Sequence, residues 1–150
     1  MLTLQRVTAK EDVAAVRLLF AEYVQAVAAR ECFVGFEREI AVLPEGYAAL
    51  FLAKDGDAAA GCAAMRRLDP TSAEMKRLYV RPAHRGKRAG KLLTQKVIDV
   101  ARQEGCRRLL LDTLPQMDCA LELYLSLGFK ETGVYLAEPT PGARCFELQL

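Results

Sequence analysis

Four basic side chains gather where an apolar strand is predicted to turn into a helix: Arg85, Lys87, Arg88 and Lys91. The free N–H groups and the positive dipole end of a helix N-terminus attract anions, contributing about 0.3–1 kcal/mol per charge. Cations at this end oppose the dipole, so a bound anion would compensate both effects. The pattern favours a phosphate site, although a solvated basic surface gives a similar run of charges.

The spacing of this segment excludes the common nucleotide loops. Gly86 and Gly90 are four residues apart, and GxGxxG is absent. Lys91 is followed by Leu92 rather than by Ser or Thr, so the GxxxxGK[ST] loop is absent too. The net charge of the whole chain is only +2, so neither nucleic acid nor an anionic membrane is indicated as a partner. We therefore expect a small polyanion at this turn.

The same segment resembles the acyl-CoA-binding motif of the GNAT superfamily of N-acetyltransferases. In that motif a strand reading Leu-x-Val leads through a short turn into Arg/Gln-x-x-Gly-x-Gly/Ala at a helix start. Here Leu78-Tyr79-Val80 matches the strand, Arg85 the first position and Gly90 the last. Arg88 stands where the family has its middle glycine, and we expect the turn to persist only if Arg88 keeps a negative φ.

A second segment resembles another cofactor-binding region of the family. Leu111-Asp112-Thr113 ends a strand, and Met117-x-x-Ala120-x-x-x-Tyr124-x-x-x-Gly128-Phe129 forms a short helix that ends in Gly-Phe. The family often carries Asn in place of Met117, so one hydrogen bond to the cofactor is expected to be missing. Glu147-Leu148 resembles the closing strand of one uncharacterised branch. The likeness covers most of the chain from about residue 50 onward.

The resemblance implies an N-acetyltransferase that uses acetyl-CoA and releases CoA. The strand residues Leu78, Tyr79 and Val80 would contact the pantetheine arm through their main chain. The turn and the first helical residues would hold the diphosphate: Arg85, Gly86, Lys87, Arg88, Ala89, Gly90 and Lys91.

Acetyl transfer requires a base, because a primary amine with a pKa of about 10.4 is mostly protonated at pH 7. Glu74, at the start of the strand that leads to the turn, occupies the position of such a carboxylate in many relatives, and it could act through water. The alternative is an exposed strand-end charge paired with Lys76 or Arg77. His84, the single histidine, is a rival base but lies in the phosphate turn, away from the expected thioester.

Tyr124 is the candidate acid. A leaving thiolate resembles cysteine, with a pKa of about 8.5, and a tyrosine with a pKa of about 10 can donate a proton to it. Tyr124 shares a predicted helical face with Ala120 and Leu121 and aligns with the family's usual acid. The alternative is a core tyrosine whose hydroxyl bonds a backbone carbonyl.

The acceptor, a small-molecule or peptide amine, is less closely specified. The first two predicted helices and a late loop cover the open side of such folds, and acidic groups there would suit a cationic amine. An apolar core stripe flanked by solvated glutamates explains the same residues equally well. The candidates are Glu22, Tyr23, Phe33, Phe36, Glu37 and Tyr135.

Composition indicates one globular domain over residues 1–150. The chain is 52% hydrophobic and is too short for two cores. Five cysteines without a CxxC pair, together with one histidine, argue against a metal site and for reduced thiols in a cytoplasmic protein. The N-terminus does not resemble a signal sequence, and no apolar run is long enough for a membrane span. The oligomeric state is open, a homodimer included.

The order of predicted elements gives an α/β fold with a mixed, mostly antiparallel central sheet and about four helices. Strands are predicted at 2–7, 49–54, 58–68, 73–80, 107–112, 129–135 and 143–150, and helices from Thr8 or Asp12, at 33–43, 86–103 and 117–127. The resemblance further implies that the strands at 73–80 and 107–112 splay apart and form a parallel pair with a cleft between them.

Two other functions are compatible with these features. One is an acyl-CoA-binding or sensor module that keeps the phosphate turn without catalysis. The other is an RNA- or protein-interaction domain whose basic run forms the contact surface. CoA binding would exclude the second, and transfer to an amine would exclude the first.

Overall fold

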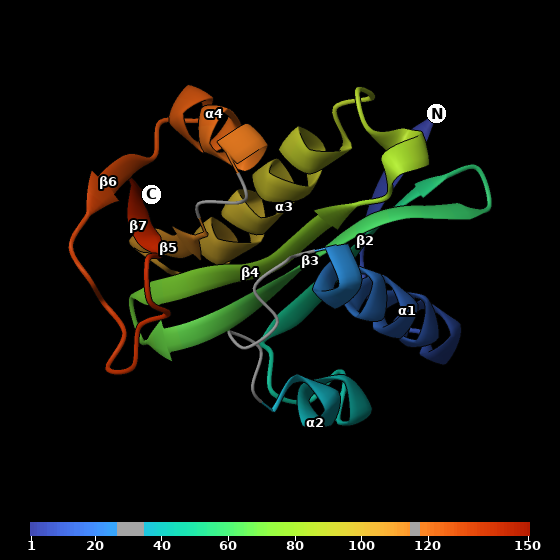
Figure 1. Cartoon of the computed structure of the whole chain (residues 1–150), viewed down its shortest axis with the longest axis horizontal. Coiled ribbons are helices and arrows are strands. Elements are labelled where there is room, and N and C mark those ends of the chain that lie inside the picture. Colours follow the sequence, from blue (N-terminus) through green and yellow to red (C-terminus); the bar gives the residue numbers. More distant parts are fainter. Residues whose placement is uncertain (27–34, 115–117) are drawn as a thin grey trace.

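The computed structural model describes residues 1–26, 35–114 and 118–150, which form one mixed sheet covered by helices on both faces (Figure 1). The strands are β1 (Leu2–Arg6), β2 (Ala49–Asp55), β3 (Ala58–Asp69), β4 (Ser72–Val80), β5 (Arg108–Thr113), β6 (Lys130–Thr132) and β7 (Arg144–Gln149). The helices are α1 (Lys10–Ala26), α2 (Phe36–Ala41), α3 (Ala89–Gln103) and α4 (Asp118–Ser126), with a 3-10 turn, η2, at Pro82–His84.

The seven strands are ordered β1-β2-β3-β4-β5-β7-β6, and every pair is antiparallel except β4 with β5. That parallel pairing covers only three residues in each strand, from Ser72 opposite Arg108 to Glu74 opposite Leu110. Beyond Glu74 and Leu110 the two strands diverge. The predicted mixed sheet and its splayed parallel pair are confirmed.

Each face of the sheet carries its own apolar core. On one face, α3 and α4 cover a core that includes Phe51, Leu93 and Phe146. On the other face, α1 and α2 cover a core built around Phe20 and Leu52.

A bulge interrupts β4 just beyond the point where the strands part. Cys62 of β3 lies opposite Tyr79, whereas Ala64 lies opposite Lys76, so β4 holds one residue more than β3 here. Arg77 takes up the extra residue with φ 59°, a left-handed conformation. The alternation of side chains therefore shifts, and Lys76 and Arg77 both face α1 and α2.

The predicted elements are present, and the ends of several differ from the expected bounds. The helix expected at 33–43 covers only Phe36–Ala41, and Phe33 lies outside the described residues. The helix expected from Gly86 begins at Ala89, because Gly86 and Arg88 both have positive φ. The helix expected at 117–127 is Asp118–Ser126, and Met117 also lies outside the described residues. The strand expected at 129–135 is only Lys130–Thr132.

Three further sequence expectations concern groups placed by the fold. Cys62, Cys106 and Cys145 are buried free thiols. Within the described ranges no three metal-ligating side chains come together. In the same ranges, each helix is too short or too polar to cross a lipid bilayer.

Candidate active site

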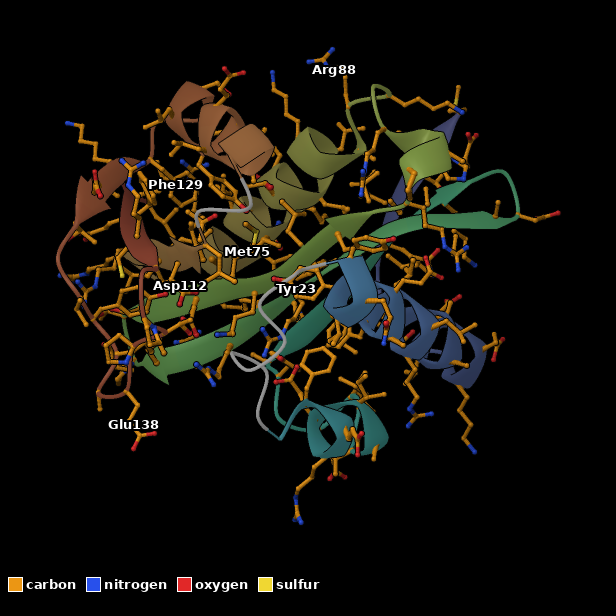
Figure 2. All side chains as sticks on the ribbon, viewed as in Figure 1. Tyr23, Met75, Arg88, Asp112, Phe129 and Glu138 are labelled. Atoms are coloured by element: carbon orange, nitrogen blue, oxygen red, sulfur yellow. The ribbon has the colours of Figure 1, made fainter. Side chains whose placement is uncertain are left out.

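A small cavity of about 40 Å³ lies where β4 and β5 diverge. Its walls come from α1, from four consecutive residues of β4, from the end of β5 and from α4. The lining residues are Tyr23, Met75, Lys76, Arg77, Leu78, Leu111, Asp112, Thr113 and Tyr124. Figure 2 labels three of these lining residues, Tyr23, Met75 and Asp112, which lie near one another in this view.

The basic turn follows β4 and opens α3. Gly86 and Arg88 have φ values of 83° and 66°, and Arg88 is the N-cap residue of α3 without a side-chain cap hydrogen bond. The expectation that the turn persists only with a negative φ at Arg88 is therefore wrong: the turn is present, and Arg88 adopts the left-handed conformation that a glycine would adopt most easily. The turn persists because Arg88 tolerates that conformation, at a cost of about 1–2 kcal/mol.

Two cations of the turn have protein partners. Lys87 Nζ lies 2.9 Å from Asp55 Oδ2, and Arg85 Nε donates to the carbonyl of Val80 at 3.1 Å. The hydrogen bond from Lys87, with help from the N-terminal ammonium, lowers the pKa of Asp55 to about 2. His84 Nδ1 lies 3.4 Å from the same carboxylate, so the histidine belongs to this outer group and not to the cavity.

An open hollow of about 530 Å³ adjoins the turn, lined by Met1, Leu2, Asp55, Lys87, Arg88 and Leu92. It combines two cations with one carboxylate.

Glu74 is the last residue of β4 that pairs with β5, and it is fully buried. Arg66 Nη2 donates to its Oε1 at 2.6 Å, and the Tyr135 hydroxyl donates to its Oε2 at 2.6 Å. Lys76 Nζ is more distant, at 4.0 Å. The expected pairing with Lys76 is therefore present at the longer distance, but the expected exposure is wrong, because none of the Glu74 side chain is exposed and its closest cation is Arg66.

The hydroxyl of Tyr135 is held as a proton donor. Burial raises its pKa well above the ordinary tyrosine value, and the charge and hydrogen bond of Glu74 raise it further. The sequence-predicted base and one sequence-predicted acceptor residue therefore form a single hydrogen-bonded pair.

Tyr124 projects from α4 into the cavity and is only 5% exposed. Burial raises its pKa, and Tyr23 and Asp112 raise it further. Its ring packs on Phe129 at a centroid distance of 5.8 Å. Among the described residues no backbone carbonyl accepts a hydrogen bond from its hydroxyl.

Comparisons with known proteins agree with this geometry. Residues 13–129 match the acetyltransferase (GNAT) family. An uncharacterised N-acetyltransferase of Schizosaccharomyces pombe is 32% identical over 155 residues, covering 99% of this chain and 95% of the relative. The chain belongs to the GNAT family.

Solved structures show the same fold. An acetyltransferase from Streptococcus agalactiae superposes with a TM-score of 0.82 at 20% identity, covering 99% of this chain and 98% of that one. A putative acetyltransferase from Salmonella typhimurium, solved with acetyl-CoA, has a TM-score of 0.72 at 24% identity, covering 99% and 93%. As a GNAT N-acetyltransferase, this protein uses acetyl-CoA as its donor.

Two features of the cavity wall leave polar groups available to a ligand. Past Glu74, the edge of β4 that faces β5 has no strand partner in the described part of the chain, which leaves main-chain groups for amide contacts. Thr113 Oγ1 is buried in the cavity wall without a hydrogen-bond partner among the described residues. Such an orphaned group is expected where a ligand supplies the partner.

The residues predicted to contact the acceptor do not all lie at the cavity between β4 and β5. Tyr23 lines the cavity, whereas Glu22 pairs with Arg81 at 2.7 Å and lies 3.4 Å from the Tyr79 hydroxyl. Phe36 is buried, 4.8 Å beneath the Arg77 guanidinium. Glu37 is exposed on α2, and Phe33 lies outside the described residues.

Arg77 and Asp112 are among the cavity-lining residues to which sequence reasoning gave no role. Arg77 lines the cavity only because of the bulge, and strand periodicity gives no sign of an inserted residue. Asp112 is part of the second motif, but the motif alone does not assign a role to its carboxylate.

Proposed function

We propose that this protein transfers the acetyl group of acetyl-CoA to a primary amine by direct attack, with Tyr124 as the acid. One observation carries the proposal: Tyr124 lines the cavity where β4 and β5 diverge, and β4 runs from this cavity to the basic turn that opens α3. A donor lying along β4 would extend from the turn to this tyrosine.

The donor site follows from the turn and the strand. Leu78, Tyr79 and Val80 would offer main-chain groups to the pantetheine arm. Arg88 and Lys91 have no ion-pair partner among the described residues, so their charges are available to the diphosphate. Arg85, Gly86, Lys87, Ala89 and Gly90 complete the turn, and Lys87 would exchange Asp55 for phosphate oxygen.

Tyr124 would restore the leaving thiol. The nitrogen lone pair of the acceptor forms the N–C bond as the C–S bond breaks, and the sulfur takes the bond electrons and the Tyr124 proton. The raised pKa keeps Tyr124 protonated throughout the neutral range. Proton donation of this kind typically accelerates a reaction by about 10²–10⁴-fold.

The amine must lose protons to a base, and Glu74 stays a candidate with a restriction. Both of its oxygens already accept strong hydrogen bonds, so it could take a proton only through the Tyr135 hydroxyl or through water. In this arrangement the Tyr135 hydroxyl would pass a proton on to Glu74, in addition to contacting the acceptor.

The acceptor, a small-molecule or peptide amine, would enter from the side covered by α1 and α2. Tyr23 would form one wall of its path, and Phe36 beneath Arg77 would fix the position of α2. Glu22 is held by Arg81 and would shape this opening indirectly.

The test is acetyl-CoA turnover over a panel of amines, measured by release of free thiol, with Tyr124→Phe as the variant. We expect Tyr124→Phe to lower kcat by about 10²-fold or more while the CoA Kd, from calorimetry, changes by less than about twofold. Turnover within about twofold of wild type would remove Tyr124 from the mechanism. CoA binding without transfer to any amine would indicate a sensor module instead.

A further inference from the structure

Glu39, Glu74 and Asp112 are three of the carboxylates on the α1/α2-facing side of the sheet, and the first two are fully engaged. Glu39 of α2 accepts two hydrogen bonds from Arg77, at 2.9 and 3.0 Å. Glu74 accepts from Arg66 and Tyr135, both at 2.6 Å. The third carboxylate, Asp112, has no hydrogen bond or ion pair with residues 1–26, 35–114 or 118–150.

The strand register places Asp112 at the reaction cavity. Leu110 is the last β5 residue opposite β4, so Asp112 lies two residues beyond the divergence and on the same face as Glu74. Asp112 is half-buried and lines the cavity together with Tyr23 and Tyr124. In Figure 2 Asp112 lies near Met75 and Tyr23, which line the same cavity.

We propose that Asp112 binds the ammonium group of the acceptor and takes the proton that nitrogen loses during attack. This inference rests on the proposed function and names the class of acceptor: an amine that arrives as a cation. The ammonium first loses one proton to solvent while held by Asp112. When the N–C bond forms, the second nitrogen proton passes to the Asp112 carboxylate, the C–S bond breaks, and Tyr124 protonates the sulfur.

The groups that face Asp112 favour this role. Tyr23 from α1, Tyr124 from α4, and Tyr135 and Cys145 from the last segment all have raised pKa values, burial being the main cause in each and Asp112 a contributor. These four groups therefore stay neutral around Asp112. Of the two β4 cations that line the cavity, Arg77 is engaged by Glu39, and Lys76 lies 4.0 Å from Glu74.

Glu74 is the less suitable proton acceptor on the same evidence. Its carboxylate is fully buried, and protonating it would break a 2.6 Å hydrogen bond from either Arg66 or Tyr135. Protonation would also neutralise the carboxylate that pairs with the Arg66 guanidinium, so this charge-assisted hydrogen bond would be weakened. Asp112 can receive a proton without loss of a protein partner among the described residues.

The experiment compares Asp112→Asn, Glu74→Gln and a matched control, Asp57→Asn, whose side chain is exposed at the β2–β3 turn. Each protein is assayed by thiol release with acetyl-CoA and five amines: spermidine, kanamycin, tyramine, L-lysine and L-methionine. We expect Asp112→Asn to lower kcat/KM for the amine by about 10²–10⁴-fold. The CoA Kd and the thermal midpoint should match those of Asp57→Asn.

The pH profile separates a proton acceptor from a structural residue. In both proteins the ammonium releases its first proton to solvent, so kcat/KM should rise with pH up to the amine pKa in each. The further loss of kcat/KM at acid pH that protonation of the Asp112 carboxylate causes should be present in wild type and absent in Asp112→Asn. Asp112→Ala should regain part of its activity when formate is added, because formate can replace the missing carboxylate.

The outcomes distinguish failure of the Asp112 assignment from failure of the proposed function. If Asp112→Asn keeps kcat/KM within about threefold of wild type for every amine used, while Glu74→Gln loses activity, Asp112 is not the proton acceptor. Loss of activity in Asp112→Asn without formate rescue in Asp112→Ala also overturns the assignment. If the wild type binds CoA but acetylates none of the five amines, the proposed function fails, and the inference with it.

Discussion

Arg77 of β4 and Glu39 of α2 form a two-bonded ion pair, with Nε–Oε2 and Nη2–Oε1 distances of 2.9 and 3.0 Å. The guanidinium also lies 4.8 Å from the centre of the Phe36 ring. Although burial opposes it, hydrogen bonding from Arg77 lowers the pKa of Glu39. This pair ties the bulge of β4, one wall of the cavity, to the helix that covers the acceptor side.

Arg77→Ala should destabilise the fold, because it leaves the largely buried Glu39 carboxylate without its strongest partner. We expect a loss of about 1–3 kcal/mol in the free energy of unfolding, measured by urea titration. Arg38→Ala, at an exposed position of α2, is the control and should change stability by less than about 0.5 kcal/mol.

The contribution of this pair has a defined pH dependence. Since the folded-state pKa of Glu39 is lowered, the stabilisation is present above the ordinary glutamate pKa of about 4.3 and is lost as pH falls through the lowered value. The difference between wild type and Arg77→Ala should therefore be full at pH 7 and shrink toward acid pH. A difference that grows on acidification would contradict the assignment.

Replacing Arg88 separates backbone strain from charge. Arg88→Ala and Arg88→Gly both remove the cation, but only glycine relieves the left-handed conformation at φ 66°. We expect Arg88→Gly to be more stable than Arg88→Ala by about 1 kcal/mol in urea unfolding. Both variants should lose CoA affinity equally, and equal stability of the two would show that this conformation is not strained.

Asp55→Asn should strengthen CoA binding. Asp55 is the carboxylate in the hollow beside the turn and holds Lys87 at 2.9 Å, so its removal frees a cation and removes a repelling anion. We expect the CoA Kd to fall about two- to fivefold in low salt, with a smaller gain at high salt. Weaker binding in the variant would mean that Asp55 positions the turn for the ligand.

The assignment of Tyr124 as the acid predicts how kcat changes at alkaline pH. Its pKa is raised, so the protonated, active form is present below the ordinary tyrosine value of about 10 and is lost only above it. With a saturating amine, kcat should rise or stay level from pH 7 to pH 10. A fall of kcat with an apparent pKa of about 8–9 would contradict protonated Tyr124 as the donor.

The fold was predictable from the sequence because its strands and helices carry clear apolar periods. The β2–β3 hairpin around Asp55 and Gly56 and the apolar face of α3 are examples. What the pattern could not give is long-range pairing. Tyr135 and Glu74 are 61 residues apart, and Arg77 and Glu39 are 38 apart, so their bonds depend on the finished fold.

The positive φ of Arg88 could not be predicted from the sequence, for a local reason. Steric preference assigns a negative φ to arginine, and only the surrounding turn overrides it. The availability of Asp112 was equally invisible, since it depends on where the partners of Glu39 and Glu74 lie.

The central claim is that the donor's diphosphate binds at the turn that opens α3, and titration calorimetry of CoA with two Gly90 variants tests it most directly. A Cβ at Gly90 would meet Leu123 at 3.5 Å and Val80 at 3.9 Å, ordinary contacts, so Gly90→Ala adds bulk without strain or charge. Gly90→Asp adds an anion at a position where the helix dipole favours it, so the fold should persist. We expect micromolar CoA binding by wild type, less than about a threefold change in Gly90→Ala, and at least about tenfold weaker binding in Gly90→Asp. CoA binding by Gly90→Asp as tight as by wild type would contradict the account.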